Sequence, residues 1–185
     1  MKKLCLLVIC LPIIVFAQPS YECNRSKNKQ FKDSVVEIMF TLVNQHRVSH
    51  NLHKLKWCNK IQKSCLSHSK YMAYQSLMTH TEKNKSNPYY TGAHSWHRTG
   101  LDMCGENVLA GYQYSGRNAK PWMYVKKILN AKELATSWFV LWKESLSHNE
   151  NMLDKQWNYM AFDYYGFVDV PSEYYDNMYA TQLFK

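Results

Sequence analysis

Two close pairs of histidines are the first residues whose spacing suggests chemistry. His50 with His53, and His94 with His97, are near enough in sequence for two imidazoles to hold a metal ion. No cysteine or carboxylate completes either set nearby, and both pairs lie in segments that predict loops. We therefore interpret all four as surface imidazoles.

Ser145 and His148 raise a second possibility, a serine nucleophile with a nearby base. A nucleophile of this kind usually sits on a sharp strand-turn-helix elbow, and the sequence around Ser145 does not have that pattern. Serine is equally expected where a helix ends, so we disfavour serine catalysis.

The first residues predict an export signal. Lys2 and Lys3 precede an uncharged apolar run over residues 4–16, which is shorter than the roughly 20 residues of a membrane-spanning helix. We expect residues 1–17 to be a signal peptide, the mature protein to be secreted, and no stable membrane span. The alternative is a retained membrane anchor.

The cysteines that remain after such cleavage are even in number, which predicts two disulfides in an oxidising compartment. They are Cys23, Cys58, Cys65 and Cys104. On one helix, Cys58 and Cys65 would lie roughly 10 Å apart along the axis, beyond disulfide reach. We favour Cys65 with Cys104 and Cys23 with Cys58. A free or metal-bound set is the alternative, although no C-x-x-C pair suggests a zinc ribbon.

The chain is basic. Its formal charge of +9 becomes +7 without Lys2 and Lys3, which favours anionic partners such as glycosaminoglycans or acidic lipid head groups. No nucleic-acid motif accompanies the charge, so we expect no nucleic-acid partner. Asn24 and Asn84 begin glycosylation sequons. We expect a monomer.

Apolar periodicity predicts three helices, over residues 33–47, 59–76 and 131–146. Residues 18–32 are polar and aperiodic, which indicates a flexible N-terminal segment. Residues 79–104 are rich in Asn, Ser, Gly, Tyr and His, and we expect a long loop there. Long loops in compact domains are often functional.

The remaining segments indicate late strands. A short helix is expected after Gly105, a loop over residues 115–122, and strands over residues 157–165 and 178–184. Helices followed by strands in one chain of this length predict a single α+β domain built in layers.

Several segments then line up in an order that resembles the CAP superfamily, the cysteine-rich secretory, antigen 5 and pathogenesis-related 1 proteins. They are Leu42-Val43-Asn44-Gln45-His46-Arg47, Leu55-Lys56-Trp57, His68-Ser69-Lys70-Tyr71-Met72-Ala73, Met78-Thr79-His80-Thr81, Arg98-Thr99-Gly100, Cys104-Gly105-Glu106-Asn107-Val108-Leu109-Ala110 and Trp142-x-x-Ser145-x-x-His148-x-x-Asn151-Met152-Leu153. The resemblance covers residues 33–185 and implies a three-layer α-β-α sandwich.

The resemblance also implies a central cleft with two histidines and two acidic residues. His80, Glu106 and His148 match three of these positions. At the fourth, longer eukaryotic members have a glutamate and this chain has Ser145, while Glu144 lies one residue earlier and is turned by about 100° around a helix. Imidazole and carboxylate ligands suit Zn²⁺, so the implied metal ligands are His80, Glu106 and His148, with Glu144 as a further candidate.

Other residues suggest structural roles. We expect Arg98 to pair with a buried carboxylate rather than with a substrate, Asn107 to fix a turn through its side chain, and Trp142 to line the core face of its helix.

The resemblance implies a secreted binding or interaction protein, for which lipid or sterol is a candidate ligand. Met123, Tyr124, Val125 and Ile128 are candidate lining residues, although such residues more often form ordinary core. One alternative is a metal-assisted hydrolase or protease that uses the three implied ligands. Another is a receptor- or glycan-docking module without a ligand in the cleft. We favour binding over catalysis.

Overall fold

The computed structural model describes residues 21–111, 130–166 and 178–185, without the side chains of residues 21–28. The helices are α1 (Tyr21–Ser49), α2 (Asn59–Gln75), α3 (Ser95–Thr99), α4 (Ala131–Glu144) and α5 (Leu146–Leu153). The strands are β1 (Lys56–Trp57), β2 (Gly105–Gly111), β3 (Tyr159–Tyr165) and β4 (Met178–Phe184).

The four described strands form one mixed sheet in the order β1-β3-β4-β2. Strand β4 pairs antiparallel with both β2 and β3, whereas the short β1 runs parallel to the start of β3. In this register Glu106 lies opposite Leu183, and Asn107 lies opposite Gln182. The sheet therefore holds the Gly-Glu-Asn segment against the last strand of the chain.

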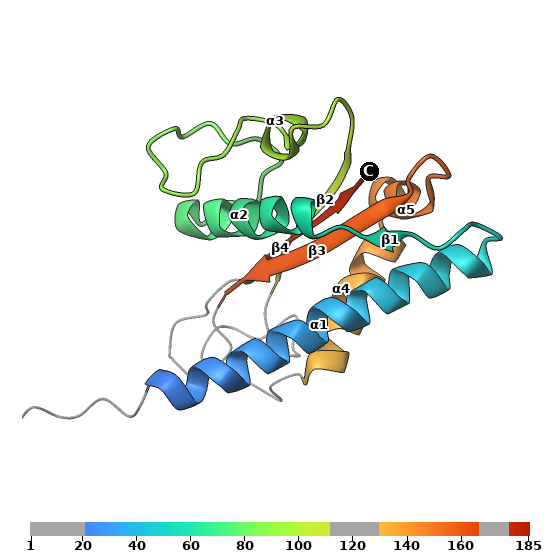
Figure 1. Cartoon of the computed structure of the whole chain (residues 1–185), viewed down its shortest axis with the longest axis horizontal. Helices are drawn as coiled ribbons and strands as arrows, with labels where there is room; N and C mark the ends of the chain where they lie inside the picture. The colour runs from blue at the N-terminus through green and yellow to red at the C-terminus, as the bar shows by residue number, and fades with distance from the viewer. Residues whose placement is uncertain (1–20, 112–129, 167–177) are drawn as a thin grey trace, which may run out of the picture.

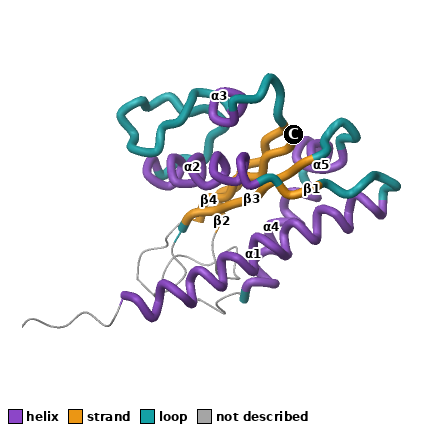
Figure 2. Tube along the Cα trace, viewed as in Figure 1, coloured by secondary structure: helices purple, strands orange, loops and turns teal. Residues whose placement is uncertain are grey.

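Helices cover both faces of the sheet (Figure 1). Helix α2 lies on one face, and α1 packs with α4 across the other. The loop that carries α3 lies beyond α2, and α5 lies near the end of the sheet where β4 ends (Figure 2). This arrangement confirms the predicted three-layer α-β-α sandwich.

Side chains of strand β3 contribute to two hydrophobic clusters, one on each face of the sheet. Successive side chains of a strand point to opposite faces. Phe162 and Tyr164 join the larger cluster, with Trp138 and Trp142 of α4, while Ala161 joins the smaller cluster under α2. A strand that is buried on both faces needs apolar residues at consecutive positions, and this explains the run from Tyr159 to Phe162, which the buried Asp163 ends.

Helix α4 has a well-defined start. The side chain of Asn130 accepts from the backbone N–H of Glu133 at 2.9 Å, and the Glu133 carboxylate accepts from the N–H of Asn130 at 3.0 Å. This reciprocal capping box satisfies two donors that the first helical turn would otherwise leave free. The capping box thus fixes the start of the helix whose Trp138 and Trp142 side chains lie in the core.

The helix expected after Gly105 is wrong, because that segment forms strand β2. Its Val108 and Leu109 are both buried, on opposite faces of the sheet. A short apolar run has no periodicity that separates a buried strand from a helix, so only the pairing with β4 decides between them.

Three boundaries also differ from expectation. Helix α1 begins at Tyr21, inside the segment 18–32 that was expected to be flexible, and Phe31 packs against the core. The helix expected over residues 131–146 ends at Glu144, where Ser145 adopts an extended conformation before α5. The expected loop 79–104 contains α3. The expected signal peptide and the expected loop 115–122 lie outside the described residues.

Candidate functional site

Three separate segments bring His80, Glu106 and His148 to one end of the sheet. His80 follows α2, Glu106 is the second residue of β2, and His148 lies on α5. Asn107 donates to the backbone oxygen of His148 at 3.1 Å, and Asn151 donates to the backbone oxygen of Glu106 at 3.2 Å. These two amides tie α5 to β2 and set the position of His148 relative to Glu106.

The Glu106 carboxylate is buried and has a partner at each oxygen. Nδ1 of His80 lies 3.0 Å from Oε1, and the guanidinium of Arg98 donates to Oε2. Burial alone would raise the pKa of Glu106, but the hydrogen bond with His80 and the charges of Arg98 and His68 outweigh it, so the pKa is lowered. Glu106 is therefore an ionised structural carboxylate near neutral pH.

His80 and His148 differ in exposure. The His80 side chain is 57% exposed and is oriented through Nδ1 by Glu106, so its Nε2 has no hydrogen bond among the described residues. His148 is half-buried, and its Nδ1 is buried without a hydrogen-bond partner in the described part of the chain. Burial, and then repulsion from His80, lower the pKa of His148. The His148 imidazole is therefore neutral at pH values above its ordinary pKa of 6.5.

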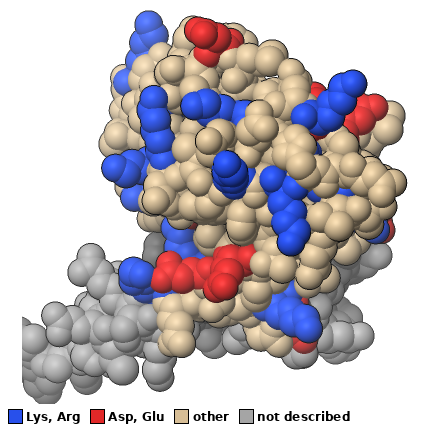
Figure 3. Space-filling model, turned by 45° about the vertical axis from the view of Figure 1, so that its right-hand side comes forward, with Lys and Arg blue, Asp and Glu red and all other residues tan. Residues whose placement is uncertain are grey.

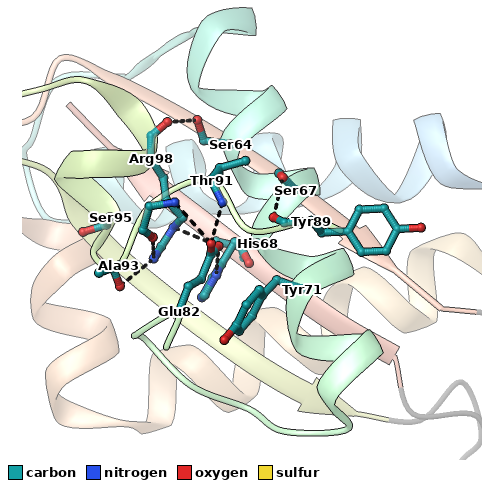
Figure 4. A network of polar contacts seen from close by, with 12 residues as sticks. Ser64, Ser67, His68, Tyr71, Glu82, Tyr89, Thr91, Ala93, Ser95 and Arg98 are labelled. Atoms are coloured by element: carbon teal, nitrogen blue, oxygen red, sulfur yellow. Dashed lines mark hydrogen bonds and ion pairs between the residues drawn. The ribbon is translucent and has the colours of Figure 1, made fainter. Parts of the chain in front are cut away.

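A buried charge cluster lies behind this site (Figure 4). His68 of α2 lies with Nδ1 2.9 Å from Oε1 of Glu82 and with Nε2 2.8 Å from the backbone oxygen of Thr79. Both ring nitrogens face acceptors, so His68 donates to both only when it carries two protons. The other Glu82 oxygen accepts from the N–H groups of Thr91 and Gly92 at 2.8 and 3.3 Å.

Arg98 joins this cluster to Glu106. Its Nε lies 3.7 Å from Glu82, its Nη2 contacts Glu106, and its Nη1 donates to backbone oxygens that include that of His80 at 3.3 Å. Arg98 thus pairs with buried carboxylates, which is the structural role that the sequence favoured. It also fixes the backbone that carries His80.

The other candidate residues have structural surroundings. Glu144 is exposed at the end of α4, and Ser145 is the extended residue between α4 and α5. Trp142 is buried, and its indole donates to the backbone oxygen of Val108 at 3.3 Å. Asn107 lies within strand β2 rather than in the expected turn, and it links α5 to Gln182 of β4.

The cysteines whose side chains are described are free thiols. They are Cys58, Cys65 and Cys104. The structure therefore contains neither the favoured Cys65–Cys104 bond nor a bond from Cys58 to Cys23, whose own side chain is not described. Cys65 faces the sheet inside the smaller core cluster, and burial raises the pKa of its thiol. Of the two sequons, Asn84 lies in an exposed loop, and the side chain of Asn24 is outside the described part.

The histidine pairs of the sequence also have local partners. His53 Nε2 lies 2.8 Å from the backbone oxygen of Trp157, and His50 Nδ1 lies 2.9 Å from that of His46. His94 stacks on Trp96 with ring centroids 4.4 Å apart. Among the described residues, no group of three or more His, Cys, Asp or Glu side chains has the arrangement of a metal site.

Most of the chain matches a known protein family. The sequence profile of the cysteine-rich secretory protein family, CAP, matches residues 40–182. The chain belongs to this family. Its CAP domain places the Asn44-x-x-Arg47 segment on α1, the Gly-Glu-Asn segment on β2 and the Ser145-x-x-His148 segment around the start of α5.

Two solved structures have the same fold. An extracellular protein with an SCP domain from Bacillus anthracis is 20% identical, with a TM-score of 0.57 over 91% of this chain and 44% of that one. An outer surface protein from Borrelia burgdorferi is 13% identical, with a TM-score of 0.53 over 80% of this chain and 90% of that one. The chain thus spans less than half of the Bacillus protein. Comparison with proteins of curated function finds no match.

The described helices of this CAP domain include none that is both long enough and apolar enough to cross a membrane.

The buried pair formed by His68 and Glu82 was not among the site residues predicted from the sequence. His68 lies on the face of α2 that also carries Cys65 and Met72, and this position predicts burial. Glu82 is the first acidic residue after Glu37, but nothing in its neighbourhood shows that it turns inward. The two residues meet only because the loop after α2 folds back over that helix.

Proposed function

We propose that the chain is an exported binding protein whose ligand is held by the imidazoles of His80 and His148. The observation that supports this is the state of Glu106. Its two oxygens are occupied by His80 and Arg98, and its lowered pKa disfavours proton uptake. A hydrolase that used this carboxylate as a general base would need a free oxygen and a pKa nearer to neutrality.

A divalent cation such as Zn²⁺ is the ligand that these imidazoles fit best. The orphaned Nδ1 of His148 and the free Nε2 of His80 are the available nitrogen donors, and a neutral imidazole is the form that binds metal. Glu106 would then act from behind His80, as the carboxylate that fixes the orientation of a ligating ring. Such a cation would keep positions open for water or for a group of the partner.

Zinc titration tests this proposal. We expect wild-type protein to bind Zn²⁺ in isothermal calorimetry, and H80A or H148A to weaken binding by at least about tenfold. H97A, which removes an exposed imidazole elsewhere, is the matched control and should bind as wild type does. Equal binding by all four proteins would contradict the assignment.

A peptidase and esterase screen with Zn²⁺ present separates binding from hydrolysis. The binding proposal predicts no turnover. Turnover that H80A abolishes, with the circular dichroism spectrum unchanged, would support the metal-assisted hydrolase instead. The geometry favours binding because no described carboxylate near the imidazoles is free to act as a base.

Lipid or sterol binding remains a proposal that rests on the family. The residues expected to line an apolar cavity, Met123, Tyr124, Val125 and Ile128, lie outside the described residues. Extraction of the purified protein with organic solvent, followed by mass spectrometry, would detect a retained lipid. A blank result would favour docking to an extracellular protein or glycan.

A further inference from the structure

A long stretch of the chain contains no acidic residue. Between Glu37 and Glu82 the sequence has no Asp or Glu. The basic residues of this stretch are Arg47, Lys54, Lys56, Lys60, Lys63 and Lys70. A second acid-free stretch, residues 107–132, lies largely outside the described residues. The other long segments that the structure describes contain residues of both signs, whereas α2 carries three of these six basic residues and no acidic one.

Helix α2 turns its lysines to one side. At 100° per residue, Lys60, Lys63 and Lys70 fall within an arc of about 80°, and they extend over about 15 Å of helix axis. The opposite face of the helix carries Ile61, Cys65 and other residues that pack on the sheet. We call Lys60, Lys63 and Lys70 the lysine row.

The charges of the lysine row are not neutralised within the described structure. Lys60 and Lys63 are exposed, and no described carboxylate lies within 4 Å of either ammonium group. By contrast, Lys29 and Lys32 of α1 each contact an aspartate at 2.6 Å. Figure 3 shows one face of the molecule with basic side chains spread across it and acidic ones gathered in few places.

Tyrosine side chains lie next to Lys70, at the C-terminal end of the lysine row. The ammonium group of Lys70 lies 5.4 Å from the ring centroid of Tyr89 and 5.8 Å from that of Tyr165. Tyr74, one helical turn further on, is 60% exposed and meets Tyr89 edge to face at 6.4 Å. Aromatic faces beside unpaired ammonium groups offer stacking and charge to the same ligand.

We propose that the lysine row and Tyr74 form a second binding surface, for an anionic polysaccharide with sulfate or carboxylate groups. A linear polyanion can follow the helix and place its charges on successive lysines, while a sugar ring lies on a tyrosine. Residues 59–73 of α2 expose no large apolar side chain, whereas Tyr74, Leu77 and Met78 beyond them are exposed. A membrane surface is therefore the competing partner, and the vesicle measurement below tests it. The proposal does not depend on the function proposed for the His80 site.

A charge-matched pair of variants tests the surface. K60Q/K63Q removes two charges from the lysine row, and K132Q/K143Q removes two exposed charges from α4, on the other side of the sheet. Binding of a fluorescein-labelled heparin oligosaccharide is measured by polarisation between 50 and 200 mM NaCl. We expect K60Q/K63Q to bind about 10-fold or more weakly at 100 mM salt, with a salt slope lower by about one per lysine. The control and H80A should bind as wild type does.

Three results would overturn the proposal. The first is equal loss in the two double variants, which would show that only net charge matters. The second is the absence of heparin binding by wild type at 50 mM salt. The third is loss of binding to phosphatidylserine vesicles or single-stranded DNA in K60Q/K63Q while heparin binding is retained, which would assign the surface to that partner. Thermal unfolding of each variant establishes that the fold is intact.

Discussion

The buried carboxylates of Glu82 and Glu106 have different partners. Glu82 is surrounded by His68, Arg98 and two backbone N–H groups, whereas Glu106 is shared between Arg98 and the exposed His80. A buried charge is tolerated only when it is paired and its remaining lone pairs accept hydrogen bonds. The buried residues Glu82, Arg98 and Glu106 therefore fix the position of the loop that carries His80.

Glu82→Gln tests this internal support. The substitution keeps the shape of the side chain but removes one of the two carboxylates beside the buried Arg98 guanidinium. We expect a loss of about 3–5 kcal/mol in the free energy of unfolding, because breaking a buried pair exposes an uncompensated charge to the interior. Urea denaturation followed by tryptophan fluorescence measures it.

Glu150→Gln, at an exposed position of α5, is the control for Glu82→Gln and should change stability by less than about 0.5 kcal/mol. Similar small effects for both variants would show that the Glu82 cluster does not stabilise the fold.

At the scale of the elements, the end of α5 depends on a residue of α1. Arg47 is buried, and its Nη1 donates to the backbone oxygens of Met152 and Asp154 at 2.8 and 2.9 Å. Its Nε donates to the backbone oxygen of His53 at 3.0 Å. The last carbonyls of a helix have no partner within the helix, so this guanidinium supplies one and holds α5, with His148, against α1.

Arg47→Met should loosen α5 more than the other helices. The methionine fills much of the same space but donates no hydrogen bond to the carbonyls. We expect a destabilisation of about 3 kcal/mol and faster amide exchange in α5 than in α2. Hydrogen exchange read by mass spectrometry measures both helices in one sample.

Lys143→Met, at an exposed position of α4, is the control for the Arg47 variant and should leave exchange in α5 unchanged. Unchanged protection of α5 in Arg47→Met would contradict the role that we assign to Arg47.

At the scale of the whole molecule, one carboxyl group and two imidazoles share one direction of pKa shift. The pKa values of Glu106, His46 and His148 are all lowered, the two histidines chiefly by burial. Each folded form therefore binds protons less readily than the unfolded chain. By linkage, the stability from these groups is present above their ordinary pKa values and is lost as the pH falls through the folded values.

The free energy of unfolding should accordingly fall as the pH decreases from 7.5 to 5. For the histidines the loss begins near their ordinary pKa of 6.5, and for Glu106 a further loss follows below 4.5. The urea midpoint at several pH values measures this trend. His148→Gln should remove part of the loss around pH 6, and His97→Gln should leave the profile as in wild type. A midpoint that stays constant or rises between pH 7.5 and 5 would contradict the expectation.

Periodicity in the sequence was sufficient for the elements that have one buried face. It placed α2 and the body of α4, because an amphipathic pattern records which side of a helix meets the core. Strands β2 and β4 are buried on both faces and have no such period; β4 was predicted with the same bounds, and β2 was wrongly predicted as a helix. Periodicity also failed at Ser145, where one residue between α4 and α5 leaves the helical conformation.

The sequence by itself determined the family and the layered α+β fold and indicated the candidate histidine and glutamate residues, since these follow from local patterns and their order along the chain. Only the tertiary structure decided what those residues do together. It placed Arg98 between Glu82 and Glu106, left the described cysteines as free thiols, and turned His68 inward. These outcomes depend on contacts between residues that are far apart in the chain. Such contacts form only in the folded protein, where the loop after α2 packs over that helix.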